Sequence, residues 1–180
     1  QVKGDVRSRV WVFDSKEEYL AFTATLSRRA EHTLGVFHPS LNTLLLFTRM
    51  NDKLNEHVLF HEGFHQYLHE AVKNVPWWFN EGMAELLGST TFDAEGKPHE
   101  GRLLEGRLST LKAHLAAGRE LVSFRSLMLM SSRAFMAPRV VSLHYAQSWS
   151  MAHFFRMGKH VRARALFRVY TNEILRSGGA

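Results

Sequence analysis

Residues 61 to 85, HEGFHQYLHEAVKNVPWWFNEGMAE, combine histidines and glutamates in a spacing that suits a metal ion. His61 and His65 are four residues apart, which on a helix places both imidazoles on one face, close enough to bind a single ion. Glu62 projects from a neighbouring face, so its carboxylate can reach a water molecule on that ion without taking a ligand position. This is the HExxH pattern, in which two histidines bind zinc and the glutamate is a general base.

Four histidines of this segment fall in one row, so the register of the motif has to be chosen. His57, His61, His65 and His69 each lie four residues from the next. Only His61 is followed by a glutamate and also has a histidine four residues further on. We therefore expect His57 and His69 to be packed, or to lie around the ligands without binding the ion.

A catalytic zinc needs a third protein ligand and keeps one position open for water. The extended pattern HExxHxxGxxH does not supply that ligand, because Leu68 and Ala71 stand where its Gly and last His would be. A separate helix could supply a carboxylate, and PWWFNEGMAE offers Glu81. One turn later, Glu85 is placed to accept a hydrogen bond from the far nitrogen of a ligand histidine.

The strands and helices that the sequence patterns predict around these residues give an α+β fold, with a small early β-sheet followed by a mostly helical C-terminal half. Alternating apolar residues over 10–13 predict a strand, followed by a helix that is capped at Asp14-Ser15. The apolar runs 36–37 and 44–47 predict a hairpin or paired strands. Further helices are expected over 54–72, 79–87, 103–117, 124–130, 144–157 and 161–175.

Length and composition predict one folded domain. The 180 residues are 45% hydrophobic, which is enough to bury a core, and no repeat or interdomain linker is evident. We expect a single domain over 1–180, with a strand, helix and sheet part over 1–53, the zinc-binding helices over 54–99 and a helical part over 100–180. No apolar stretch approaches the ~20 residues that a membrane span needs.

Cysteine content and charge narrow the kind of site. The chain has no Cys, so a metal must bind to His, Asp, Glu or water. The net charge of +6 is concentrated late in the chain, which is more typical of a solvated helix face than of a nucleic-acid site. We therefore expect no nucleic-acid partner, and the sequence does not define an oligomeric state.

The ends of the sequence bear on where the protein acts. The chain begins at Gln1 without a charged start that leads into a hydrophobic signal region, and it ends in Gly-Gly-Ala. We expect a processed or trimmed piece whose targeting segment lies outside this sequence. The sequence does not define a compartment, although an extracytoplasmic location, either secreted or periplasmic, fits such a piece.

The pairing HEGFHQYL…PWWFNEGMAE resembles the gluzincin zinc metallopeptidases and is similar to the compact peptidase-MA-like domains of many bacterial proteins. The resemblance covers about 36–87 and, more weakly, YAQSWSMAHFF at 145–155. It implies a zincin-like fold in which His61, His65 and Glu81 hold one Zn²⁺ ion.

The same resemblance implies roles for the surrounding residues. Glu62 would be the general base, and Glu85 the acidic partner of a ligand histidine. The strand at 44–47 would be the cleft edge on which an extended peptide pairs through backbone hydrogen bonds.

Two further residues complete the expected mechanism. Zinc lowers the pKa of a bound water toward ~7, so that Glu62 can take its proton and pass it to the leaving amine. Tyr145, with His144 as the alternative, is the expected hydrogen-bond donor to the oxyanion, although an aromatic residue at a helix start more often serves packing. Gly63 costs ~1 kcal/mol relative to Ala inside a helix, which suggests close approach of another backbone.

Three functions are compatible with these observations. The first is a zinc-dependent peptidase, and the second is a non-catalytic binding module that keeps a metal and the zincin fold. The third is binding of nucleic acid or an anionic membrane by the basic C-terminal helix. An intact Glu62 favours the first, because a purely structural metal site has no use for a base. The ion itself is inferred, since His and carboxylate ligands also accept Mn, Co or Fe.

Overall fold

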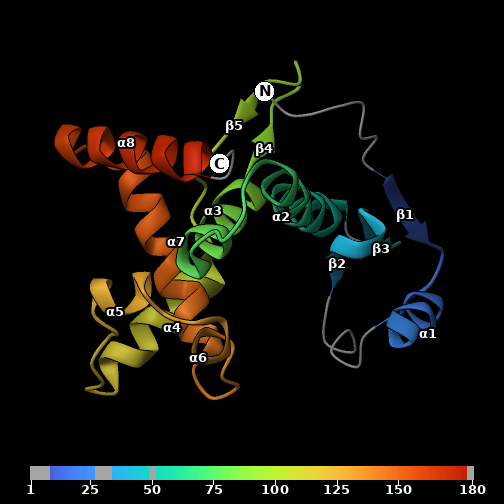
Figure 1. Cartoon of the computed structure of the whole chain (residues 1–180), viewed down its shortest axis with the longest axis horizontal. Coiled ribbons are helices and arrows are strands. Elements are labelled where there is room, and N and C mark those ends of the chain that lie inside the picture. The colour runs from blue at the N-terminus through green and yellow to red at the C-terminus, as the bar shows by residue number, and fades with distance from the viewer. Residues whose placement is uncertain (1–8, 27–33, 49–51, 178–180) are drawn as a thin grey trace. The chain divides into compact units, whose positions relative to one another are not determined.

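The computed structural model describes residues 9–26, 34–48 and 52–177. The chain divides into two compact units, residues 1–71 and 72–180. A small mixed sheet lies in the first unit, and the rest of the described chain is mostly helical, with eight α-helices (Figure 1). The predicted α+β fold is therefore confirmed, whereas the single domain over 1–180 stays a prediction.

The sheet of the first unit has three strands, in the order β1-β3-β2. They are β1 (Arg9–Phe13), β2 (Gly35–His38) and β3 (Thr43–Phe47). β3 pairs in parallel with β1 and antiparallel with β2. A short 3-10 turn, η2 (Pro39–Leu41), joins β2 to β3 and ends at Asn42, which has a left-handed backbone with φ of 46°. The two strands predicted from the apolar runs 36–37 and 44–47 are thus confirmed as a hairpin.

β3 is the central strand, so the prediction that residues 44–47 form a cleft edge is wrong. Each residue of β3 pairs with β1, and the residues from Thr43 to Leu46 also pair with β2. With a partner strand on both sides, β3 has no free backbone edge to which a peptide could add. Among the described strands of this sheet, β1 and β2 each have a neighbour on one side only. The edge strand of this hairpin is therefore β2.

Two helices pack on this sheet. α1 (Lys16–Leu26) begins after Ser15, whose side chain accepts a hydrogen bond from the backbone N–H of Glu18 at 3.2 Å. This is the predicted cap. Tyr19 of α1 is fully buried and forms the core of the unit with Leu45 and Phe47 of β3. α2 (Asp52–Ala71) contacts β2 and β3 and carries the histidine row.

The second unit is built on helix packing around α3 and α7. α3 buries Trp78 and Phe79, which are 1% and 2% exposed, and the indole N–H of Trp78 donates to the Tyr170 hydroxyl at 3.2 Å. None of the helices in the described ranges combines the length and hydrophobicity needed to cross a bilayer. The helices are α3 (Trp77–Gly88), α4 (Glu105–Ala116), α5 (Phe124–Met128), α6 (Ser132–Phe135), α7 (Val141–Met157) and α8 (Val161–Ser177).

A two-stranded hairpin and one short helix of this unit were not expected from the sequence. The hairpin consists of β4 (Thr91–Phe92) and β5 (Pro98–His99), and the helix is α6. Each strand has two residues and α6 has four. Such segments are too short to show an apolar period, which needs about 4–8 residues for a strand and more for a helix.

Candidate metal centre

The HExxH motif lies on α2 as its spacing predicts. The imidazole rings of His61 and His65 lie with their centroids 4.8 Å apart, at an interplanar angle of 84°. Both side chains are half-buried. The four-residue spacing has therefore brought the two rings together on one helix face.

Glu81 of α3 joins these histidines in a group that could hold a metal ion. Each of the three residues offers one ligand atom, and these atoms all lie within 4.8 Å of one another. Ligand atoms about 2.1 Å from a tetrahedral zinc ion are about 3.4 Å apart, a separation of the same order. Two imidazoles and one carboxylate form a donor set that zinc accepts while keeping a fourth position open. His61, His65 and Glu81 are thus a candidate metal site.

Burial of α3 carboxylates gives this group an electrostatic reason to hold a cation. Glu81 is 4% exposed and Glu85, one turn later, is 3% exposed. Two carboxylates buried on one helix face repel each other, and a buried carboxylate is costly unless it is paired or coordinates a metal. A cation held at Glu81 would offset this repulsion.

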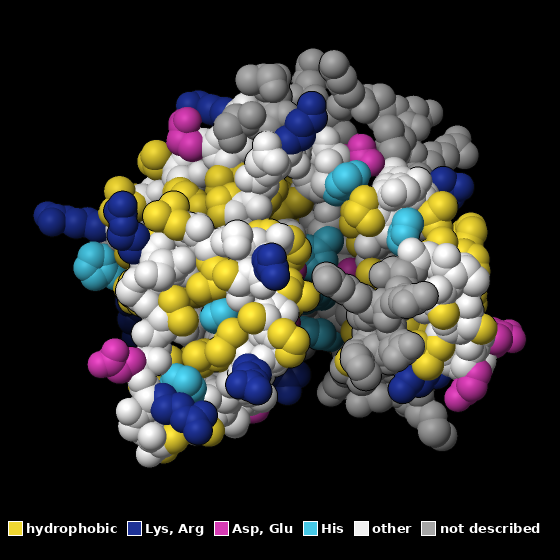
Figure 2. Space-filling view, turned by 60° about the horizontal axis from the view of Figure 1, so that its bottom comes forward, with side chains coloured by type: hydrophobic (Ala, Val, Ile, Leu, Met, Phe, Trp, Pro, Cys, Tyr) yellow, Lys and Arg dark blue, Asp and Glu magenta, His cyan; other side chains and the backbone are white. Residues whose placement is uncertain are grey.

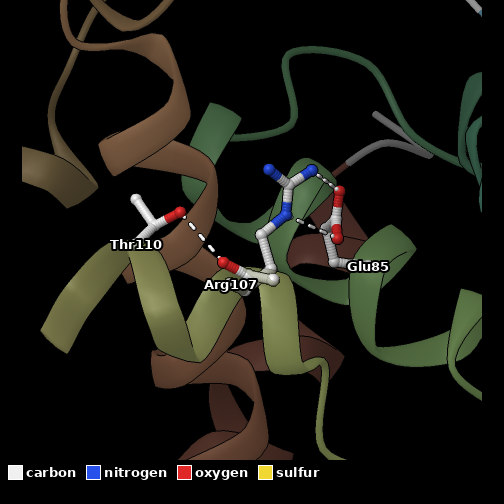
Figure 3. A network of polar contacts seen from close by, with 4 residues as sticks. Glu85, Arg107 and Thr110 are labelled. Carbon is white, nitrogen blue, oxygen red and sulfur yellow. Dashed lines mark hydrogen bonds and ion pairs between the residues drawn. The ribbon is translucent and has the colours of Figure 1, made fainter. Parts of the chain in front are cut away.

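Glu85 has a partner that the sequence did not reveal. Arg107 of α4 donates from Nε to Glu85 Oε2 at 2.9 Å and from Nη2 to Oε1 in a second, short hydrogen bond. Figure 3 shows the guanidinium reaching from α4 to this carboxylate, with Thr110 bonded to the Gly106 carbonyl at 2.9 Å one turn further along the same helix. A bidentate pair of this kind fixes the orientation of the carboxylate.

The charge of Arg107 is firmly retained in this environment. Burial alone would lower the pKa of Arg107, but the hydrogen bonds and charge of Glu85 outweigh it. Together with smaller contributions from Tyr145 and Glu81, these interactions with Glu85 raise the pKa of Arg107 above its ordinary value. Arg107 is therefore a permanent cation beside the two buried carboxylates.

The Arg107 pair also distinguishes between two candidate ligand groups. His57, His61 and Glu85 form a second group whose ligand atoms lie within 4.8 Å of one another. Both oxygens of Glu85 already accept hydrogen bonds from Arg107. An ion in the second group would have to compete with this pair, so the group with Glu81 is the better candidate.

Replacing Arg107 with Met should destabilise the protein. The variant leaves Glu85 buried without its cation, and breaking a buried ion pair from one side costs about 3 kcal/mol. We expect a loss of that order in the free energy of unfolding, measured by urea denaturation of the metal-free protein. The double variant Glu85→Met, Arg107→Met is the control and should recover most of the loss, because apolar partners can replace a buried pair. Unchanged stability of the single variant would contradict this account.

Glu62, the expected general base, is held by the edge strand of the sheet. Its Oε2 accepts a hydrogen bond from the backbone N–H of Phe37 in β2 at 2.8 Å. One turn later, Gln66 Nε2 donates to both the backbone oxygen and Oδ1 of Asn42, each at 3.1 Å. These contacts fix the HExxH face of α2 against β2 and the turn that follows it.

Tyr145 and His144, the two expected oxyanion donors, lie in different environments at the start of α7. Tyr145 is half-buried, and Arg107 Cζ lies 5.1 Å from the centre of its ring. His144 is 3% exposed, and its Nδ1 is 2.8 Å from the Phe135 carbonyl oxygen. Because that nitrogen donates to the backbone, His144 is committed to packing. Tyr145, beside the Arg107–Glu85 pair, remains the better candidate.

The outer members of the histidine row have different surroundings. The ring of His57 is half-buried, with its centroid 6.1 Å from that of His61. His69 is exposed, and its ring lies 5.4 Å from that of Phe37. Their expected roles outside the ligand set stay predictions.

The close backbone approach expected at Gly63 is found at Gly82 instead. Among the described residues, no heavy atom would lie within 4 Å of a Cβ added to Gly63. A Cβ on Gly82 of α3 would overlap the carbonyl group of Ser148 on α7. Gly82 therefore lets α3 and α7 approach closely between the two buried glutamates, whereas Gly63 has no such packing role.

The fold and the site together define an α+β protein with an HExxH helix and a candidate His-His-Glu metal centre. Residues 57–175 match the family described as Protein of unknown function (DUF1570), and the match covers more than half of the chain. The chain therefore belongs to the DUF1570 family. Comparison with curated proteins and with solved structures gave no significant match. The family description names no activity.

Proposed function

We propose that this chain is a gluzincin-type peptidase in which His61, His65 and Glu81 bind one Zn²⁺ ion. The observation that carries the proposal is that one ligand atom from each of these residues lies within 4.8 Å of the others. In the sequence, Glu62 directly follows His61. When bound, zinc would polarise the scissile carbonyl and acidify a water molecule.

Glu62 would move the proton of the reaction. Its carboxylate would accept a proton from the attacking water and deliver it to the leaving amine, so that water and a peptide bond become a carboxylic acid and an amine. Glu85, oriented by Arg107, would accept a hydrogen bond from a ligand histidine and hold its ring in place. The hydroxyl group of Tyr145 would donate a hydrogen bond to the oxyanion.

The substrate would be an extended peptide that adds to β2. The N–H of Phe37 donates to the Glu62 side chain rather than to β3, so it is directed away from the sheet. A substrate carbonyl could accept this hydrogen bond in place of Glu62. Pairing with the edge strand would then release the carboxylate of Glu62 for proton transfer.

A non-catalytic metal-binding module is the second candidate. The hydrogen bond from Phe37 gives Glu62 a structural role that does not require catalysis. The observation therefore accounts for Glu62 in a protein that keeps the ion only to stabilise its fold.

Metal analysis combined with a cleavage assay tests the proposal. We expect about one zinc ion per chain, cleavage of an unfolded protein substrate, loss of cleavage after chelation, and its return with about one equivalent of zinc. One tightly bound ion without cleavage would favour the binding module. Cleavage that survives complete removal of the metal would contradict the peptidase proposal.

A further inference from the structure

A second candidate site lies within residues 72–180, outside the metal centre. A cavity of about 290 Å³ is found between the end of α7 and the first half of α8. It is lined by Phe155, Arg156, Val161, Arg164, Phe167 and Arg168. Three arginines thus share one cavity, and none of the lining residues is acidic.

The charges around this cavity are only partly balanced. Arg156 forms two hydrogen bonds with Glu100, from Nε at 2.8 Å and from Nη2 at 3.1 Å. In the described part of the chain, the structure gives neither Arg164 nor Arg168 an acidic partner. Three guanidinium groups and one carboxylate leave a net charge of +2 at the cavity. An anion would relieve the repulsion between the guanidinium groups.

The apolar part of the lining is flat. Phe155 and Phe167 are stacked, with ring centroids 5.5 Å apart and an interplanar angle of 12°. Phe167 is 7% exposed, so its ring is fixed by packing. An apolar or aromatic group can lie against such rings, whereas an isolated inorganic ion cannot use them.

We propose that this cavity binds a phosphate monoester carried on an apolar or aromatic group. A phosphate monoester carries a charge of about −1.5 to −2 at pH 7, which matches the charge left by the arginines. Guanidinium groups also match the geometry of phosphate oxygens. On the face shown in Figure 2, Lys and Arg side chains are spread among hydrophobic and neutral ones rather than gathered in one patch.

Isothermal titration calorimetry with phenyl phosphate in low-salt buffer tests the proposal. We expect saturable binding at one site that is weakened about tenfold by Arg164→Gln and by Arg168→Gln, because each removes a charge-assisted hydrogen bond. Arg162→Gln is the matched control, since Arg162 is an exposed arginine on the same helix but does not line the cavity. It should change the affinity less than twofold. Thermal melting of each variant checks that the fold is kept.

Two further ligands separate the parts of the proposal. Inorganic phosphate should bind at least tenfold more weakly than phenyl phosphate, because it cannot use the Phe155 and Phe167 rings. Benzyl alcohol, which lacks the anion, should not bind measurably. The proposal would be overturned if phenyl phosphate showed no saturable binding to the wild-type chain. It would also be overturned if Arg162→Gln and Arg168→Gln lost the same affinity for phenyl phosphate, or if phenyl phosphate and inorganic phosphate bound with equal affinity. Chelation of the metal should leave the affinity unchanged, so the result is independent of the proposed peptidase function.

Discussion

Replacing Glu62 with Gln is expected to abolish peptide cleavage while leaving the metal in place. Glutamine has nearly the same shape and can still accept the hydrogen bond from Phe37, but it cannot accept a proton from water. Loss of a general base typically lowers the rate about 10²- to 10⁴-fold. The measurement is kcat/KM on a peptide substrate, together with the zinc content of the same preparation.

Glu70 provides the matched control for this experiment. It is an exposed glutamate on the same helix, outside both candidate ligand groups. Glu70→Gln should keep full activity and full metal content. If Glu62→Gln cleaves as fast as the wild-type chain, Glu62 is not the base and the peptidase mechanism proposed for α2 is wrong. Simultaneous loss of metal and activity would instead assign Glu62 to the metal site itself.

Replacing Glu81 with Ala should weaken zinc binding far more than replacing His69 with Ala. Glu81 is buried and supplies a ligand atom to the candidate group, whereas His69 is exposed and belongs to neither group. Even residues that only orient ligands change metal affinity by 10- to 100-fold, so we expect Glu81→Ala to exceed about 100-fold. His69→Ala should change the affinity less than about threefold. Competition with a chromophoric chelator measures both dissociation constants.

Stability of the metal-free variants separates a lost ligand from a damaged fold. Metal-free Glu81→Ala should keep one cooperative unfolding transition in urea, as the metal-free wild-type chain does. If His69→Ala were the more harmful change for zinc binding, the register of the histidine row would have been chosen wrongly.

Much of the fold could be predicted from local patterns. The strand at 10–13, the hairpin formed by 36–37 and 44–47, and the helix with the histidines each have a clear apolar period or cap. Strand order could not be predicted in the same way. The parallel pairing of β1 with β3 joins segments separated by α1, and no local pattern encodes it. The family resemblance implied an edge position for the strand at 44–47, and no local pattern in the sequence contradicted it.

In the candidate site too, contacts within one helix could be predicted from the sequence, whereas contacts between helices could not. His61 and His65 share a helix, so their distance follows from helix geometry. Arg107 lies on α4, and its bond to Glu85 of α3 depends on how the two helices pack. An arginine in an otherwise ordinary helix has no spacing rule that would identify it. The close approach at Gly82 was missed for the same reason, because a glycine shows its packing role only when the opposing helix is known.

The proposed function depends on the binding of one zinc ion by His61, His65 and Glu81. Crystals of the zinc-loaded protein, measured on both sides of the zinc absorption edge, test it most directly. We expect one strong anomalous peak about 2.0–2.2 Å from a ring nitrogen of each histidine and from a carboxylate oxygen of Glu81. A zinc-loaded crystal with no peak at these residues, or with its peak at other side chains, would contradict it.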